Sequence, residues 1–323
     1  RDRVEDGVEL LKTNPELRRC FSWMNQSMRR AVVRQGKSFE EWRLFQIGFI
    51  LTQIRGVYER CCPDGELSED HLNHAEVLWF ATGGGKTEAY LGLLVMGMLY
   101  ERMHGRYYGP TGWMRFPLRM LSVQQFQRLS YVVAEANIIR QSEGLGGHPF
   151  TIGYFTGGGT PGSITRKEDD RGFFLPKMGP DKLEELKFVA DCPYCDEEHS
   201  ISVQSDVKAS RIKHVCSNAE CWSNTTAEAG KYGEGIRGEL GIYISDDEVY
   251  RYLPTVMVGT VDKLANIALN YRFQMFFGGA SHFCPDHGFS LGGKCIHYNL
   301  VELDNGEWDS APCPASSRPR GET

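Results

Sequence analysis

Residues 82–87 read Thr82-Gly83-Gly84-Gly85-Lys86-Thr87, and this stretch decides the fold. Consecutive glycines let a backbone curl so that its N–H groups face phosphate oxygens. A helix that starts there adds the positive end of its dipole. In such a loop the lysine reaches the β- and γ-phosphates of ATP, and the threonine hydroxyl holds Mg²⁺. The stretch, with Glu88 directly after it, therefore predicts a site for ATP and Mg²⁺.

The flanking pattern places this loop in an α/β fold. The apolar segment Val77–Phe80 predicts a strand before the loop, and Thr87 to about His104 predicts a long helix after it. Further strands are expected at Trp113–Phe116, Thr151–Phe155 and Thr255–Thr260, and helices at Ser122–Arg140 and Asp262–Phe277. Alternating strands and helices predict a mostly parallel sheet. Two helices, Leu17–Val33 and Phe39–Val57, are expected before it.

Composition excludes several classes of protein. The chain has 323 residues, enough for two domains or for one large domain with an insertion, and 41% of them are hydrophobic. The apolar run Tyr90–Tyr100 is too short to span a bilayer, and the charged segment Arg1–Glu9 is not a signal peptide. We therefore expect a cytoplasmic protein without a membrane partner. The net charge of −6 shows that a nucleic-acid site needs a local basic surface.

Ten cysteines indicate metal binding. Cys192-Pro-Tyr-Cys195 and the pair Cys216 and Cys221 have C-x₂-C and C-x₄-C spacing. Four thiolates suit tetrahedral Zn²⁺, so we expect a structural zinc ribbon; two disulfides or free thiols are the alternatives. A second set is irregular, and some four of its members could bind another zinc: Cys284, His287, Cys295, His297 and Cys313.

Several segments resemble motifs of superfamily 2 helicases. Phe80 stands where the strict phosphate-loop pattern has its first glycine, which argues against kinases and small GTPases but agrees with helicase loops that read T-G-x-G-K-T. Arg43-Leu44-Phe45-Gln46 resembles the Q motif, whose glutamine reads adenine. Pro117 to Gln124 resembles P-T-R-E-L-A-x-Q. Thr156-Gly157-Gly158 and Thr260-Val261-Asp262-Lys263-Leu264 resemble the Gly-Gly and T-P-G-R-L motifs.

The wording of these segments is most similar to the DrmA-type helicases of DISARM, a bacterial anti-phage defence system. The resemblance runs from about Arg43 to Phe277 and implies a RecA-like lobe, a partner subunit, and a nucleic-acid partner, DNA rather than RNA. It implies that ATP contacts Gln46, Thr82, Gly83, Gly84, Gly85, Lys86, Thr87 and Glu88. It implies that the nucleic acid contacts Arg115, Arg119, Gln124, Arg128, Gly157, Gly158, Thr260 and Lys263. Positive charge at Arg115, Arg119 and Arg128 independently favours contacts with phosphates.

The acidic Walker B box of helicases is missing where it is expected. Asp196-Glu197-Glu198-His199 lies between cysteine pairs, and Asp246-Asp247-Glu248 also lacks a preceding apolar strand. We therefore expect a piece of a longer protein that stops before this box, binds ATP and hydrolyses it poorly.

The expected domain boundaries are a helical extension at 1–75, a first lobe at 76–186 and 250–280, the zinc module at 187–249 and a second Cys/His segment at 281–323. Two other functions stay open: a nucleic-acid-binding module with a nucleotide switch, and a P-loop phosphotransferase with a zinc lid.

Overall fold

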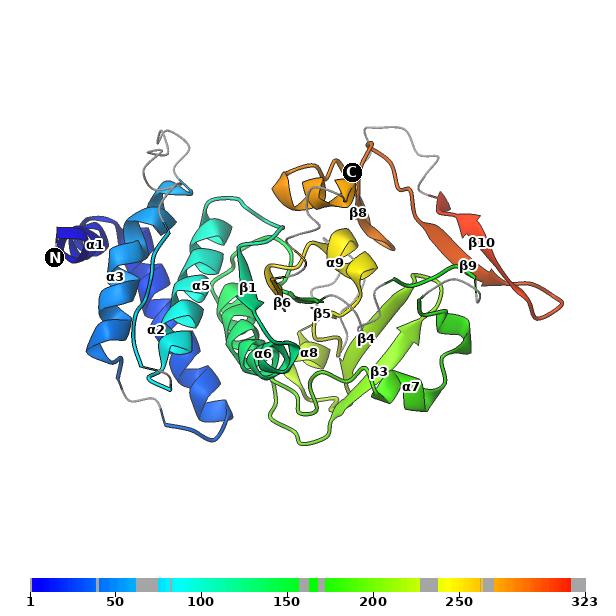
Figure 1. Ribbon diagram of the computed structural model, residues 1–323, viewed down its shortest axis with the longest axis horizontal. Helices are drawn as coiled ribbons and strands as arrows, with labels where there is room; N and C mark the ends of the chain where they lie inside the picture. Colours follow the sequence, from blue (N-terminus) through cyan, green and yellow to red (C-terminus); the bar gives the residue numbers. More distant parts are fainter. Residues whose placement is uncertain are drawn as a thin grey trace. The chain divides into compact units, whose positions relative to one another are not determined.

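Figure 1 shows the computed structural model of the protein, whose chain divides into two units. The first unit comprises Arg1–Tyr107 and Tyr131–His148, and the second comprises Tyr108–Ser130 and Pro149–Thr323. The structure describes residues 2–38, 41–61, 75–81, 83–156, 163–167, 172–226, 238–261, 263 and 270–314. In this part of the chain, no helix is both long and apolar enough to cross a membrane.

The first unit is helical. Its helices are α1 (Asp2–Thr13), α2 (Pro15–Arg34), α3 (Leu44–Glu59), α5 (Lys86–Met103) and the second half of α6 (Arg119–Ser142). Figure 1 shows α2, α3 and α5 side by side. Helix α2 begins where Asn14 Oδ1 accepts a hydrogen bond from Leu17 N at 2.9 Å, next to Pro15 at the first helical position. Helices α2, α3 and α5 confirm the sequence prediction, which had missed α1.

The strand predicted before the phosphate loop is absent. Residues 75–81 adopt neither helix nor strand, and Val77 and Trp79 are 81% and 93% exposed. Their apolar side chains fit a buried strand, but a strand also needs a hydrogen-bonded neighbour, and no described strand pairs with them. The prediction of a strand at Val77–Phe80 is therefore wrong for this structure.

The second unit contains a parallel sheet. Its strands are β1 (Gly112–Phe116), β2 (Ile152–Phe155), β5 (Ile242–Tyr243) and β6 (Val256–Thr260), in the order β1-β6-β2-β5. All three pairings are parallel, and β6 lies between β1 and β2. One face packs on a core of aromatic and aliphatic side chains: Phe155, Tyr243, Val249, Tyr250, Leu253, Met257, Phe273, Met275, Phe276 and Phe289. The expected mixed α/β fold with a parallel sheet is confirmed.

The second unit also contains shorter elements. They are η1 (Leu175–Lys177), α7 (Pro180–Glu184), β3 (Ile201–Asp206), β4 (Arg211–Cys216), α8 (Trp222–Thr225), α9 (Asp246–Tyr252), η3 (Tyr271–Phe277), β7 (His282–Cys284), β8 (Gly288–Ser290), β9 (Tyr298–Glu302) and β10 (Trp308–Pro312). The pairs β3–β4, β7–β8 and β9–β10 are antiparallel two-stranded sheets.

The helix predicted at Asp262–Phe277 is a 3-10 helix over its last seven residues, η3. Residue 262 and residues 264–269 of that prediction lie outside the described part of the chain. Asn270 starts η3 by accepting a hydrogen bond from Arg272 N at 3.0 Å, and Gly278, with φ of 89°, ends it.

Candidate functional site

The phosphate loop forms the entry to helix α5. Gly83 and Gly85 have φ of 78° and 89°, in the left-handed region that glycine adopts without strain. Gly85 is the N-cap, and the 18-residue helix starts at Lys86. The N–H groups in the first turn of a helix have no partner within the helix and can bind an anion. Thr87 and Glu88 lie in this first turn and are partly exposed, whereas Thr82 lies outside the described residues.

Two side chains of the Q-like motif hold the loop. Gln46, 4% exposed, accepts a hydrogen bond from Arg43 N at 2.9 Å and donates to Gly85 O at 2.7 Å. Arg43 Nη1 donates to Gly84 O at 2.6 Å. Sequence analysis assigned Gln46 to adenine and gave Arg43 no role of its own. In this conformation, both ends of the Gln46 amide bind protein backbone, so the residue positions the phosphate loop.

The Lys86 ammonium is also held within the loop. Its Nζ donates to Phe80 O at 2.5 Å and lies 3.5 Å from Ala81 O. Phe80 in turn stacks on Phe45, with ring centroids 3.8 Å apart. Backbone carbonyls just before the loop therefore hold this cation.

Several of the residues predicted to contact nucleic acid gather at one edge of the parallel sheet. Phe116 of β1 is in register with Thr260 of β6, so these two strands end at the same edge. Arg119 and Gln124 follow β1 at the exposed start of α6, and Arg115 is exposed on β1 itself. The carboxyl edge of a parallel sheet is where α/β proteins bind ligands. Arg128 lies one turn further along α6 and donates weakly to Gln125 Oε1 at 3.4 Å.

Lys263 and Thr260, two other predicted contacts, are less accessible. Lys263 Nζ pairs with Asp246 Oδ2 at 2.5 Å and lies 4.4 Å from the centre of the Phe155 ring. Burial raises the pKa of Asp246, and the Lys263 charge opposes that shift. Thr260 is buried, and its hydroxyl has no hydrogen-bond partner among the described residues. Gly157 and Gly158 lie outside the described part of the chain.

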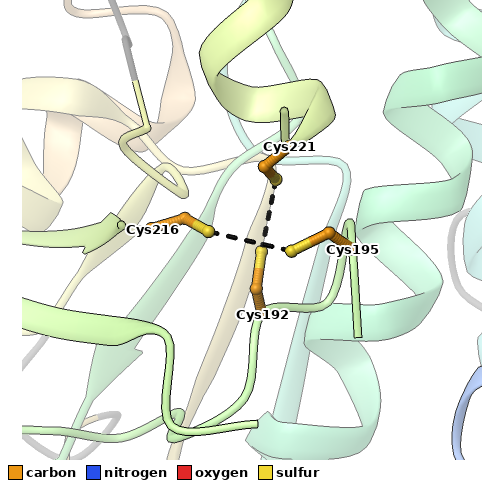
Figure 2. Close-up of side chains that lie close together, drawn as sticks. All are labelled: Cys192, Cys195, Cys216 and Cys221. Atoms are coloured by element: carbon orange, nitrogen blue, oxygen red, sulfur yellow. Dashed lines mark hydrogen bonds between the residues drawn. The ribbon is translucent and has the colours of Figure 1, made fainter. Parts of the chain in front are cut away.

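The first cysteine group is brought together as its spacing predicts. Figure 2 shows Cys192 and Cys195 from the turn before β3, Cys216 from the end of β4 and Cys221 from the start of α8, with their sulfurs converging. The Cys192 and Cys221 sulfurs are 3.6 Å apart, and those of Cys195 and Cys216 are 3.8 Å apart. All four sulfurs lie within 4.8 Å of one another.

These distances fit a tetrahedral metal ion. Two thiolates bound to Zn²⁺ at about 2.3 Å lie about 3.8 Å apart, far beyond the roughly 2.05 Å of a disulfide. A hydrogen bond with Cys192 and others from Ser223 lower the pKa of Cys221, which favours its thiolate form. Tyr194 and Trp222 stack beside the group with centroids 4.7 Å apart. The group could therefore hold a metal ion.

Helix α9 fastens this module to the sheet. Glu248, fully buried, accepts a hydrogen bond from Ile212 N of β4 at 2.9 Å. Arg251, 5% exposed, donates to Ala209 O at 2.6 Å and Ser210 O at 3.0 Å in the β3–β4 turn. It also donates to the carbonyl of His287 at 2.9 Å. Sequence analysis missed Arg251, since nothing in its local pattern distinguishes it from a surface arginine.

Of the two acidic segments, residues 196–199 follow no described strand, as expected. The expectation that Asp246-Asp247-Glu248 lacks a preceding apolar strand is wrong, because β5, a buried strand of the parallel sheet, ends at Tyr243 just before it. Residues 196–199 form part of the cysteine turn, where Asp196 and His199 have φ of 58° and 54°. Asp247 accepts from Ile164 N at 2.9 Å and pairs with Arg272 at 2.7 Å. The carboxylates of the second segment therefore cap and fasten α9.

A second group of four ligand atoms lies elsewhere in the same unit. Cys284, His287, Cys295 and Cys313 are all buried, and their ligand atoms lie within 4.8 Å of one another. His297, a fifth candidate from the sequence, is not among them. This group, too, could hold a metal ion.

Fold and sites define a mixed α/β protein with a glycine-rich loop at a helix start and two cysteine-rich groups that could bind metal. No protein-family model matches the chain. It is 30% identical over 330 residues to DISARM protein DrmA of Bacillus paralicheniformis, an alignment that covers 90% of this chain. The chain is thus a DrmA-type relative, which confirms the expected resemblance, and it spans 27% of that protein's length.

Proposed function

We propose that the chain is the ATP-binding first lobe, of RecA type, of an ATP-dependent DNA helicase or translocase in DISARM anti-phage defence. The proposal rests on the phosphate loop and on the similarity to DrmA. The family resemblance also supplies the expectation of a partner subunit of the same defence system.

The observation that best supports this proposal is the backbone conformation of the loop. With Gly85 in the left-handed region, the chain turns into α5 so that the first-turn N–H groups face outward from the helix end. A Cβ at Gly85 would lie 2.7 Å from Gln46 Nε2, so the close approach of these two residues needs a glycine. This backbone supports the proposal, because consecutive glycines let N–H groups face phosphate oxygens.

ATP binding in this proposal exchanges contacts of Lys86. Its ammonium would leave the carbonyls of Phe80 and Ala81 for the β- and γ-phosphates, and Thr87 would hold Mg²⁺. Because Gln46 and Arg43 already bind loop carbonyls, they would keep the glycines in place during this exchange.

The nucleic acid would follow the edge of the sheet where β1 and β6 end. Arg115, Arg119 and Gln124 are exposed there and offer donors to backbone phosphates. The Lys263 contact would require its ion pair with Asp246 to open. We propose a structural role for Zn²⁺ at Cys192, Cys195, Cys216 and Cys221, since four cysteines leave no open position for water.

Binding of a fluorescent ATP analogue tests the nucleotide site. Lys86→Ala should weaken binding at least about tenfold, which corresponds to roughly 1.4 kcal/mol. The matched control is Lys37→Ala, which removes an exposed lysine of the same unit outside the loop. Equal affinity of wild type and Lys86→Ala would refute the site. In the complete protein, ATP hydrolysis stimulated by single-stranded DNA should vanish in Lys86→Ala.

A second candidate is a nucleic-acid-binding module whose nucleotide site is only a switch. The observation that favours it is the set of bonds that already satisfies Lys86 and Gln46 within the protein. DNA affinity that is independent of nucleotide and survives Lys86→Ala, without hydrolysis in the complete protein, would favour this function over the motor.

A further inference from the structure

The second ligand group is assembled from three separate turns of the chain. Cys284 ends β7, His287 lies in the turn between β7 and β8, Cys295 lies between β8 and β9, and Cys313 follows β10. Their exposed fractions are 1%, 0%, 0% and 1%, respectively. Side chains separated by up to 29 residues thus meet at one buried point.

The distances match a metal site with three sulfur ligands and one nitrogen ligand. The Cys284 and Cys313 sulfurs are 3.8 Å apart, and His287 Nδ1 lies 3.7 Å from the sulfurs of both Cys284 and Cys295. Bonds of about 2.3 Å to sulfur and about 2.0 Å to nitrogen place tetrahedral ligands roughly 3.6 to 3.8 Å apart. The sulfurs are too distant for a disulfide.

Ordinary packing does not explain this burial. The three cysteines form a buried cluster of their own, separate from the aromatic core of the unit. His287 Nδ1 faces thiols, and its Nε2 has no hydrogen-bond partner among the described residues. A fully buried imidazole whose Nδ1 faces sulfurs and whose Nε2 has no hydrogen-bond partner among the described residues is costly unless it binds an ion.

His297 does not belong to the group, although the sequence offers it equally. Its Nε2 lies 3.3 Å from Phe289 O, so this ring nitrogen is engaged in a hydrogen bond to the backbone. Its ring centre is 5.9 Å from that of His287. The fourth ligand beside the three sulfurs is therefore His287.

We propose that Cys284, His287, Cys295 and Cys313 bind a second, structural Zn²⁺ ion that closes the base of the β9–β10 hairpin. Cys295 precedes β9 and Cys313 follows β10, so the ion ties the two ends of this hairpin to the β7–β8 turn. Cys313 N also donates to His297 O at 3.1 Å at the same base. Figure 1 shows the hairpin in orange and red.

The ion supplies what these elements lack. Sheets of two strands are marginally stable in water, and both β7–β8 and β9–β10 have only two. Four protein ligands leave no position for water, so the site holds chain segments together and does no hydrolytic chemistry. The site does not depend on the proposed nucleotide function, because none of its residues lies in the unit that carries the phosphate loop.

Metal content measures the second site directly. Purified wild-type chain should contain about two zinc ions, and Cys295→Ser and Cys192→Ser should each contain about one. His297→Gln and Cys61→Ser, which alter a neighbouring histidine and a cysteine outside both groups, should keep two. One zinc ion in wild type, with no loss in Cys295→Ser, would overturn the proposal.

If the variants do not fold, a measurement on the wild-type chain alone still tests the second site. Titration of metal-free chain with Co²⁺ should saturate at about two ions, with a thiolate-to-cobalt absorption for seven thiolates rather than four. Saturation at one ion, or a disulfide among Cys284, Cys295 and Cys313 in the purified protein, would contradict the site. Iron bound in place of zinc would overturn the choice of ion.

Discussion

The phosphate loop and the first cysteine group are both predicted from short sequence motifs, but the structure agrees with only one of the two predictions in full. The four cysteines converge as their spacing predicts, whereas the loop lacks the strand expected before it. Each cysteine pair, with two or four residues between its members, lies within one short local segment, and the β3–β4 hairpin brings the two pairs together. A glycine loop specifies only its own backbone; the preceding strand depends on a distant neighbour. A short motif therefore predicts the structure of its own turn, but it does not predict an element whose partner lies far away in the sequence.

Removing the first metal ligand should have the largest effect. Cys216→Ser removes one ligand of the proposed Zn²⁺ and leaves two buried thiols and the partly exposed Cys195, and we expect a loss on the order of 5 kcal/mol in the β3–β4 module. Amide hydrogen exchange in residues 192–216 should then accelerate by on the order of a thousandfold. Exchange in α2 should stay unchanged, because α2 lies in the other unit. A uniform loss of protection in both units would contradict this expectation.

Arg251→Ala should come next. Its guanidinium donates to three backbone carbonyls at 2.6 to 3.0 Å, and its removal takes this donor from the buried His287 carbonyl and from two partly buried carbonyls. We expect a stability loss of about 3 kcal/mol in urea unfolding followed by a probe in the second unit. Lys208→Ala, an exposed cation in the same β3–β4 turn, should change stability by less than about 0.5 kcal/mol.

Arg251→Lys sharpens the result. Lysine keeps the charge but lacks the planar fork, so it cannot serve carbonyls in two different turns at once. Stability close to that of Arg251→Ala would show that the shape of the guanidinium matters. Full stability of Arg251→Lys would mean that the charge alone suffices.

The first unit should respond to acid through His148. Burial, with the nearby charges of Arg102 and Arg140, lowers the pKa of His148 to about 4, below its ordinary value of 6.5. Between these values the unfolded chain binds a proton that the folded chain does not, so stability is present above about pH 6.5 and decreases as pH falls toward 4. Since the ring is partly exposed, we expect a loss of up to about 2 kcal/mol.

Unfolding of wild type and His148→Gln by urea at about pH 7.5 and pH 5 tests this expectation. The variant should lose less stability on acidification, measured by a probe in the first unit. The same loss in both proteins would exclude His148 as the cause and assign the acid sensitivity to other groups, including the metal ligands.

Local pattern predicted the elements that local sequence determines. Helices α2 and α5 and strands β1, β2 and β6 appear where apolar periodicity placed them. Strand β5 has only two residues, too few for a periodic signal. Among the metal ligands, Cys295 and Cys313 stand alone in the sequence, and the pairing of β9 with β10 brings Cys313 back to the group. The spacing of residues along the sequence therefore could not show whether His287 or His297 is the nitrogen ligand of the second group.

The smallest expected effect concerns the loop itself. Gln46→Ala removes the hydrogen bond to Gly85 O and opens space beside the glycine, while Lys86 and Thr87 stay intact. A loop held less firmly must be ordered when the nucleotide binds, so we expect affinity for an ATP analogue to fall about three- to tenfold, or roughly 0.7 to 1.4 kcal/mol. Gln53→Ala, on the same helix α3 and hydrogen-bonded to Thr52, is the matched control.

Comparing ATP with GTP separates two roles of Gln46. A loss that is equal for both nucleotides indicates positioning of the phosphate loop, as this conformation shows, because phosphates are common to both. A loss confined to ATP would mean that Gln46 leaves Gly85 to read the adenine, and the loop would then depend on its ligand for its shape, unlike the cysteine turns.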